Sequence, residues 1–196
     1  MASTAPELVV LSGPNGAGKS TLAPWLLRDG WGIKEFVNAD EIAKGLSGFQ
    51  PESVALQAGR LMWGRLEELA AGRKSFAFET TLASRTYAPW IVKRKAGDYR
   101  TRLVFLWLPS AEMAIQRVTD RVRAGGHHIP DEVIRRRYAG GLRNLFELYL
   151  PLMDRWQVLD GTEPADLRLV AQSGDDGQPE ISCEATWSRI NVHNKG

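Results

Sequence analysis

A glycine-rich stretch near the start of the chain, LSGPNGAGKST from Leu11 to Thr21, has the residue types of a phosphate-binding loop. It matches the pattern G-x-x-x-x-G-K-[ST] and directly follows an apolar run, LVVL. Glycines in such a loop let backbone N–H groups wrap a phosphate, and the next helix adds the positive end of its dipole. We expect the nucleotide to be bound by Gly13, Asn15, Gly16, Ala17, Gly18, Lys19, Ser20 and Thr21.

Two side chains of this loop carry specific chemistry. Lys19 is expected to reach the outer phosphates of ATP and to act in catalysis, and the Ser20 hydroxyl is expected to ligate Mg²⁺. The alternative interpretation is a tight turn between a strand and a helix, with a surface lysine.

Two absences narrow the class of P-loop protein. The N-K-x-D motif of GTPases does not occur in the chain. The apolar run LVFLWLP ends in proline and FAFE ends in glutamate, whereas a motor or transporter ATPase would usually carry an apolar strand that ends in aspartate. Together with the short chain, these features favour an ATP-dependent kinase that phosphorylates a hydroxyl group of a small molecule.

A kinase needs a group that accepts the proton of the attacking hydroxyl. Asp40 comes 21 residues after Lys19, at the end of the predicted strand EFVNAD. Carboxyl ends of parallel strands converge on the phosphate site, so Asp40 is the candidate base and a candidate acceptor contact. The alternative is that Asp40 caps the start of a helix.

Three polar residues, Glu79, Thr80 and Thr81, end the third predicted strand near the same sheet edge. Glu79 is expected to bind the acceptor or a water on Mg²⁺, and the threonines are expected to hydrogen-bond the acceptor. Ordinary capping of the strand end is the alternative role of each threonine.

Positive charge is concentrated between Arg117 and Arg143, a stretch that contains seven arginines and only three carboxylates. We expect residues 117–137 to form a helix–break–helix lid over ATP, with the break at GGHHIP. Its candidate residues are Arg117 for the nucleotide and Arg121, Arg123 and Arg136 for catalysis. A solvated basic surface is the alternative.

The elements that position these residues alternate between strand and helix. Apolar runs predict strands at 8–11, 35–40, 75–81, 101–109 and 155–162. Helical spacing and capping signals predict helices at 20–28, 51–72, 84–97, 110–126 and 130–154, with Gly140-Gly141 as a candidate kink. The predicted fold is α/β: one P-loop kinase-like domain over residues 1–196, a parallel sheet flanked by helices, the arginine-rich lid and a C-terminal β-hairpin at about 166–190.

Composition places further limits on function. The net charge is +2, from 25 basic and 23 acidic residues, which does not favour a nucleic-acid partner. No apolar run is long enough to span a membrane, so no membrane association is expected. The start of the chain has no signal-peptide pattern, and Cys183 is the single cysteine, so we expect a cytoplasmic protein.

The motifs GPNGAGKST, VNADEIAKGL, FAFETTLAS, RVRAGGHHIPDEVIRRRY and VLDGT together resemble the zeta-toxin family of P-loop kinases, over roughly residues 8–162. The resemblance implies ATP and Mg²⁺ as cofactors, the sugar of UDP-N-acetylglucosamine as a candidate acceptor, and an antitoxin as a candidate protein partner. It implies that Asp40 is the base, that Glu79 and Thr80 bind the acceptor, and that two of Arg121, Arg123, Arg136 and Arg137 contact phosphate. By the same resemblance Asp160, Gly161 and Thr162 lie beside the adenine.

Two other functions remain open from the residues. A nucleotide-binding switch would bind a protein partner and transfer little phosphate, but it would not need a carboxylate such as Asp40 opposite Lys19. A polynucleotide 5′-kinase would need a basic, aromatic groove beyond the lid, whereas the seven tryptophans are scattered along the chain.

Overall fold

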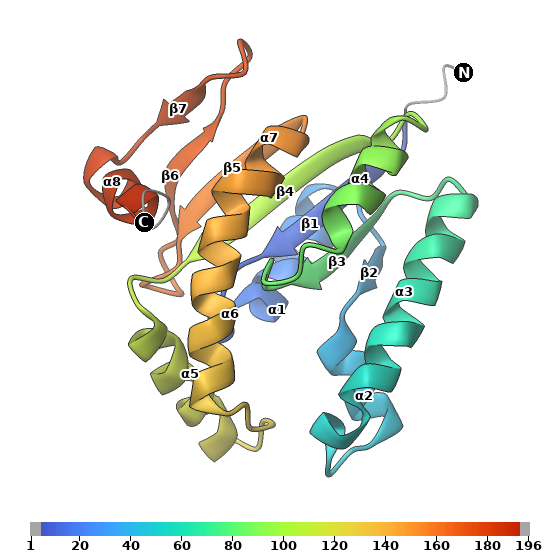
Figure 1. Cartoon of the computed structure of the whole chain (residues 1–196), viewed down its shortest axis with the longest axis vertical. Helices are drawn as coiled ribbons and strands as arrows, with labels where there is room; N and C mark the ends of the chain where they lie inside the picture. Colours follow the sequence, from blue (N-terminus) through green and yellow to red (C-terminus); the bar gives the residue numbers. More distant parts are fainter. Residues whose placement is uncertain (1–4, 193–196) are drawn as a thin grey trace.

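The computed structural model describes residues 5–192, which form one seven-stranded sheet flanked by helices (Figure 1). The strand order is β2-β3-β1-β4-β5-β6-β7. Neighbouring strands from β2 to β5 are parallel, and β5-β6 and β6-β7 are antiparallel. The expected α/β fold with a parallel core and a C-terminal hairpin is therefore confirmed.

The strands are β1 Glu7–Ser12, β2 Glu35–Val37, β3 Phe76–Thr80, β4 Arg100–Trp107, β5 Arg155–Asp160, β6 Arg168–Ser173 and β7 Pro179–Ile181. The helices are α1 Lys19–Ala23, α2 Ala39–Leu46, α3 Ala55–Ala71, α4 Tyr87–Lys95, α5 Ala111–Arg123, α6 Asp131–Asn144, α7 Leu150–Leu152 and α8 Glu184–Val192. Wider π-helical turns continue α1 over Pro24–Gly30 and join α6 to α7 over Leu145–Tyr149.

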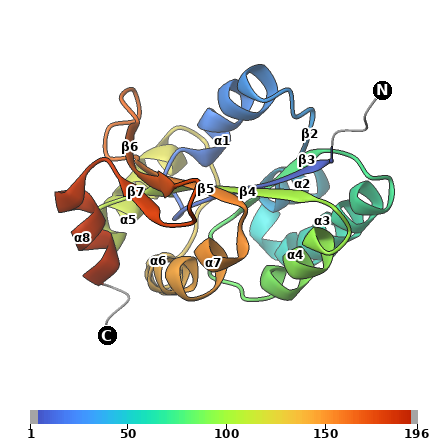
Figure 2. The same ribbon diagram turned by 90° about the horizontal axis from the view of Figure 1, so that it is seen from above.

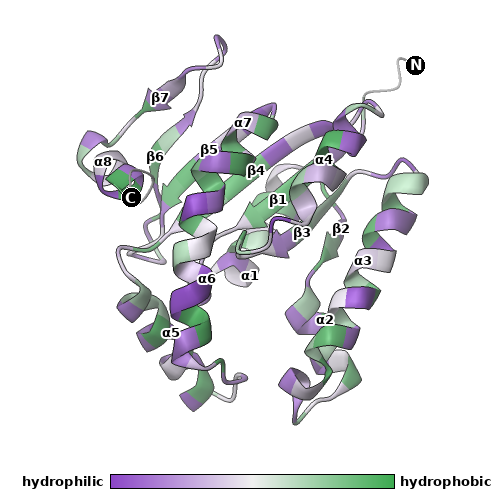
Figure 3. Cartoon of the chain, viewed as in Figure 1, coloured by the Kyte–Doolittle hydropathy of each residue, from purple (hydrophilic) through white to green (hydrophobic). Residues whose placement is uncertain are grey.

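The core lies between the sheet and the helices that cover its two faces. Figure 2 shows α1 on one face and α3, α4, α6 and α7 on the other. The central strands β1 and β4 are almost entirely buried, and Figure 3 shows them as predominantly hydrophobic. Such runs, apolar on both faces, are what a parallel strand between two helical layers requires. In the described part of the chain no helix is long and apolar enough to cross a membrane.

The second predicted strand was too long at its C-terminal end. β2 stops at Val37, which pairs with Phe78 of β3, and α2 begins two residues later. Asp40 therefore lies in the first turn of a helix and not at the end of a strand.

The predicted hairpin at about 166–190 is correct only as far as Ile181. Residues Glu184–Val192 form helix α8, not strand. The reason is a distant packing partner: the Trp187 ring stacks on Trp156 of β5 with centroids 5.9 Å apart and also contacts Phe146. Helix α8 buries Trp187 and Ile190 against the last part of the sheet.

Candidate active site

The P-loop lies at the carboxyl end of β1, in the centre of the sheet edge, where the order of strands reverses. Its glycines have the conformations that the motif requires: Gly13 has φ 140°, Gly16 has φ 78° and Gly18 has φ 91°. A Cβ on Gly13 would lie 2.3 Å from the carbonyl oxygen of Leu106 in β4. Only glycine allows the loop to pass this close to the neighbouring strand.

The Lys19 ammonium lies at the mouth of this loop. Its Nζ donates hydrogen bonds to the carbonyls of Gly13 and Pro14, both at 2.9 Å, and lies 3.5 Å from Glu79 Oε1. The side chain is 95% buried, and burial lowers the pKa of Lys19 although the charges of Glu79 and Asp40 oppose the shift. A buried cation thus faces two carboxylates across the loop.

Ser20, Glu79 and Asn38 form a polar cluster beside Lys19. The Ser20 hydroxyl donates to Glu79 Oε2 at 2.8 Å, and the Asn38 amide donates to the same oxygen at 2.9 Å. The carboxylate of Glu79 is thereby held from two sides. A hydroxyl and a carboxylate are hard oxygen ligands of the kind that Mg²⁺ prefers.

Asn38 also caps helix α2. Its Oδ1 accepts the backbone N–H of Asp40 at 2.8 Å, and its own backbone is extended, as expected at an N-cap. The alternative role considered for Asp40, that of the cap, is therefore wrong, and its half-buried carboxylate is free of that bond. Sequence reasoning missed Asn38, although an asparagine two residues before Asp40 is itself a strong N-cap signal.

A cleft of about 390 Å³ opens beside this cluster. It brings together many of the expected residues: its walls include Asn15, Lys19, Asn38, Asp40, Glu79, Thr80, Thr81, Ser84, Tyr87, Arg136 and Arg137. Thr80 and Thr81 both line the cleft, and Thr80 Oγ1 also accepts the N–H of Leu82 at 3.1 Å and so closes the turn after β3. Ser84 and Tyr87 were not expected from the sequence.

Helix α5 of the predicted lid has the capping that its sequence indicates. Ser110 accepts the N–H of Met113 at 3.1 Å at the start of α5. At its end Gly125 has φ 91°, and the N–H groups of Gly125 and Gly126 donate to Val122 and Arg121, both at 2.9 Å. This is a Schellman motif, in which glycine allows the left-handed turn.

The candidate lid arginines lie in different environments. Arg121 points inward: its charge lowers the pKa of Lys19, and its buried Nε has no hydrogen-bond partner among the described residues. Arg136 and Arg137 line the cleft. Arg123 instead is largely exposed and pairs with Asp120 at 3.2 Å, so the structure does not bring it to the other site residues.

Arg117 joins α5 to the loop after β5. Its guanidinium donates to the carbonyls of Gly161 and Thr162 at 2.8 and 2.5 Å. A Cβ on Gly161 would lie 3.4 Å from the Ala17 carbonyl and 3.1 Å from that of Trp107, so the loop packs closely on the P-loop. Asp160 stabilises the turn by accepting the N–H of Thr162 at 2.9 Å.

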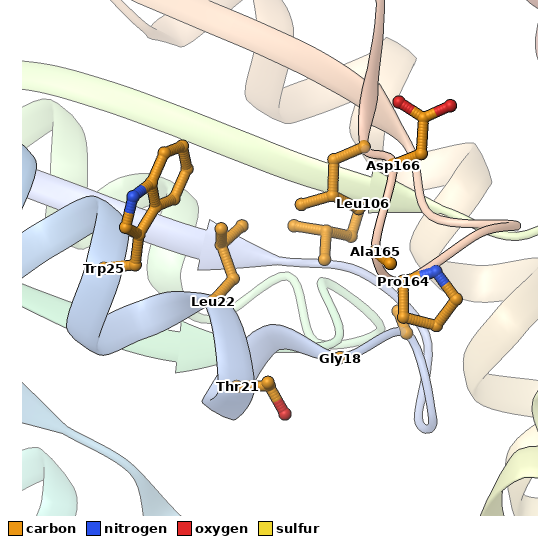
Figure 4. A pocket seen from close by; sticks show the side chains of 10 residues that line it. Gly18, Thr21, Leu22, Trp25, Leu106, Pro164, Ala165 and Asp166 are labelled. Carbon is orange, nitrogen blue, oxygen red and sulfur yellow. The ribbon is translucent and has the colours of Figure 1, made fainter.

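A second pocket, of about 440 Å³, lies on the other side of the P-loop (Figure 4). Side chains of Leu22, Trp25, Leu106 and Pro164 face it, and its walls are mainly apolar. Gly18 and Thr21, both expected at the nucleotide, line it too. Asp160 and Thr162 line a neighbouring cavity of about 230 Å³ instead. The sequence Pro164-Ala165-Asp166-Leu167, just beyond the expected residues, supplies the wall that was not predicted.

The chain matches one family model and one curated relative. The family model, described as an AAA domain, matches residues 8–140. The relative is an uncharacterized protein of Haemophilus influenzae, 25% identical over 132 residues that cover 67% of this chain and 92% of that protein.

Solved structures share the fold of the chain. The complex of AvrRxo1-ORF1 with AvrRxo1-ORF2, solved with sulphate ions and with ATP, gives a TM-score of 0.74 at 17% and 16% identity. The chain is covered to 94% and 96% but spans only 63% and 64% of that longer chain. The PezAT chromosomal toxin-antitoxin system of Streptococcus pneumoniae gives 0.65 at 16% identity, covering 100% of this chain and 87% of that one. Shikimate kinase from Acinetobacter baumannii in complex with shikimate gives 0.50 at 20% identity, covering 81% and 86%.

Proposed function

The chain belongs to the AAA domain family and has the fold of P-loop kinases, and we propose that it is an ATP-dependent kinase that phosphorylates a hydroxyl group of a small molecule. One observation carries this proposal. Lys19 of the P-loop, the carboxylate of Asp40 and two arginines of α6 line one cleft, next to a second pocket that adjoins the same loop. A reaction between two substrates needs two such binding volumes that share the phosphate-binding loop.

In this proposal ATP binds with its phosphates in the P-loop. Backbone N–H groups of the loop and the Lys19 ammonium hold the outer phosphates. The apolar pocket beside Leu22, Trp25 and Pro164 takes the base or ribose, and Arg117 holds the 161–162 loop against the P-loop.

The oxygen ligands fit Mg²⁺. Among residues 5–192 no group of three His, Cys, Asp or Glu side chains could hold a metal by itself. Mg²⁺ commonly uses one or two protein oxygens together with substrate phosphates, and the adjoining Ser20 hydroxyl and Glu79 carboxylate offer this arrangement. When bound there, the ion would neutralise charge on the phosphates.

The acceptor hydroxyl enters from the cleft side. Asp40 accepts its proton as the oxygen attacks the terminal phosphorus of ATP, the bond from that phosphorus to the bridging oxygen breaks, and ADP leaves. Thr81, Ser84 and Tyr87 offer hydrogen bonds to the acceptor. Arg121 and Arg136 stabilise the charge on the transferring group, because cations placed where charge develops lower the barrier most. These roles make the cleft an acceptor site.

The proposal also names a particular acceptor and a particular kind of protein partner. The sugar of UDP-N-acetylglucosamine is the acceptor to test first, because the motifs resemble those of zeta toxins. An antitoxin is the protein partner to test first, because the PezAT structure is described as a toxin-antitoxin system. The cytoplasmic location stays a prediction.

Transfer of radioactive phosphate from ATP to an acceptor tests the proposal. The protein is incubated with [γ-³²P]ATP, Mg²⁺ and a panel of nucleotide sugars and simple sugars, with Asp40→Asn as the matched control. We expect a labelled product from the wild type and little from Asp40→Asn. Release of phosphate alone, equal in the two proteins and independent of every acceptor, would show a nucleotide hydrolase or switch instead.

A further inference from the structure

The segment between β3 and α4, residues 81–86, forms one wall of the acceptor cleft through Thr81, Ala83 and Ser84. We call it the acceptor loop. Leu82 at its centre is completely buried and has φ 59°, a left-handed conformation. A residue other than glycine keeps this strained backbone only where surrounding contacts impose it.

Those contacts come from helix α6. A Cβ on Gly141 would lie 2.4 Å from the carbonyl oxygen of Thr81, so only glycine allows the helix to approach the loop this closely. A Cβ on the preceding Gly140 would meet Ala83 at an ordinary 3.8 Å. The helix continues through both glycines, so the pair does not end it. The glycine needed for close approach is therefore Gly141 alone.

Two side chains just beyond Gly141 hold the same loop by hydrogen bonds. Asn144, which is 1% exposed, donates through Nδ2 to the carbonyls of Leu82 at 2.8 Å and Ala83 at 3.2 Å. The Tyr149 hydroxyl donates to the Ser84 carbonyl at 2.6 Å. Burial raises the pKa of Tyr149 well above its ordinary range, so this hydroxyl keeps its proton. Asn144 and Tyr149 together thus donate hydrogen bonds to three successive carbonyls of the loop.

The same helix presents charge to the acceptor cleft. Arg136 and Arg137 lie one turn before Gly141 and line the cleft, and neither forms an ion pair within residues 5–192. The two arginines and the residues that hold the acceptor loop thus lie on one continuous helical segment.

Resting on the kinase function proposed above, we propose that α6 and the π-helical turn that follows it set the shape of the acceptor loop through Gly141, Asn144 and Tyr149, and thereby determine which acceptor the cleft takes. These three are positioning residues, since they act through the loop backbone and none of them lines the cleft. The nucleotide pocket on the far side of the P-loop contains none of them.

The test compares Gly141→Ala with Gly140→Ala, which adds the same methyl group where there is room. Hydrogen exchange of the peptide covering residues 81–86 reports the loop, and the Kd of the fluorescent nucleotide mant-ATP reports the nucleotide site. UDP-N-acetylglucosamine is the acceptor probe for KM, beside the sugar panel used above. Tyr149→Phe, which only removes one hydroxyl, serves as a milder variant should Gly141→Ala fail to fold.

We expect Gly141→Ala to speed exchange in the acceptor loop by about tenfold. The KM for the acceptor should rise by about fivefold or more, while the Kd for mant-ATP stays within about twofold of wild type. Gly140→Ala should match wild type in all three measurements, and Tyr149→Phe should move in the same direction as Gly141→Ala by less.

Unchanged exchange in both Gly141→Ala and Tyr149→Phe would overturn the proposal, as would loss of mant-ATP affinity equal to the loss for the acceptor. A wild-type protein inactive on the whole panel would count against the proposed function. The exchange and mant-ATP measurements would still decide the role of α6, because they require no transfer.

Discussion

Asn38 Oδ1 accepts the backbone N–H of Asp40 at 2.8 Å, while the amide nitrogen of the same side chain donates to Glu79 at 2.9 Å. One buried side chain therefore links the candidate base to the carboxylate beside Ser20. The helix cap and the organisation of the site depend on the same residue, and the two roles can be separated by substitution.

Asp40→Asn should remove transfer and leave the fold intact. Asp40 does not cap α2, and an amide in the first helical turn loses only a favourable dipole interaction of about 0.3–1 kcal/mol. Loss of a general base costs about 10²–10⁴-fold in rate. The turnover number, the melting temperature and the mant-ATP affinity are measured together. Normal transfer by this variant would mean that another group is the base.

Asn38→Ala and Asn38→Ser should differ from each other in stability but should lose activity to the same extent. Serine still caps α2, whereas alanine loses about 1 kcal/mol of stability. Alanine has no donor, and serine lacks the longer amide group through which Asn38 reaches Glu79. We therefore expect both variants to lose about tenfold in kcat and to need more Mg²⁺ for half-maximal rate. Wild-type kinetics in Asn38→Ser would show that Asn38 acts only as the cap of α2.

Much of this fold follows from local signals. The P-loop, the Ser110 cap and the Gly125-Gly126 end of α5 each depend on a few adjacent residues, and the structure has all three as predicted. Alternation of apolar runs with helical spacing was sufficient for the parallel core, because its central strands β1 and β4 are buried on both faces.

The features that sequence reasoning missed depend on contacts between distant segments. The end of β2 is set by pairing with β3, and this pairing decides whether residue 38 or residue 40 caps α2. Helix α8 exists where Trp187 meets Trp156, 31 positions earlier in the chain. The need for Gly141 comes from the Thr81 carbonyl, which no local pattern reveals.

Lys19→Met should abolish ATP binding without lowering stability at neutral pH. Burial lowers the pKa of Lys19 below 10.5, so the folded state holds the charged form at a cost. Between the pKa of Lys19 in the folded protein and 10.5, the unfolded chain binds more protons than the folded protein does. The free energy of unfolding of the wild type therefore rises with pH through that range. The melting temperature of the variant should therefore equal or exceed that of wild type at pH 7, and this advantage should shrink as the pH approaches 10.5.

The control for that experiment is mant-ATP binding in the same samples. Methionine fills nearly the same volume but cannot donate to Gly13 and Pro14 or contact phosphate. A large fall in the melting temperature at pH 7 would show that the hydrogen bonds of Lys19 outweigh the cost of burying its charge.

The last prediction separates the two arginines at the end of α5. Arg121 lies close enough to Lys19 to affect its pKa, and its guanidinium donates to the His127 carbonyl at 3.4 Å. Arg123, two residues on, points away and pairs with Asp120 on the surface. The two variants Arg121→Ala and Arg123→Ala remove the same side chain from the same helix turn, so each is a control for the other.

We expect Arg121→Ala to lower kcat by about a hundredfold or more and to raise the Kd for ATP by less, because a cation aimed at the transferring phosphoryl group stabilises the transition state more than the bound substrate. Arg121→Lys should recover only part of the rate, since an ammonium lacks the planar fork that grips two oxygens. Arg123→Ala should stay within about twofold of wild type, as expected for an exposed ion pair. Equal losses in the two alanine variants would mean that α5 turns toward the phosphates during the reaction, and no loss in either would leave the arginines of α6 as the cations that act on the transferring group.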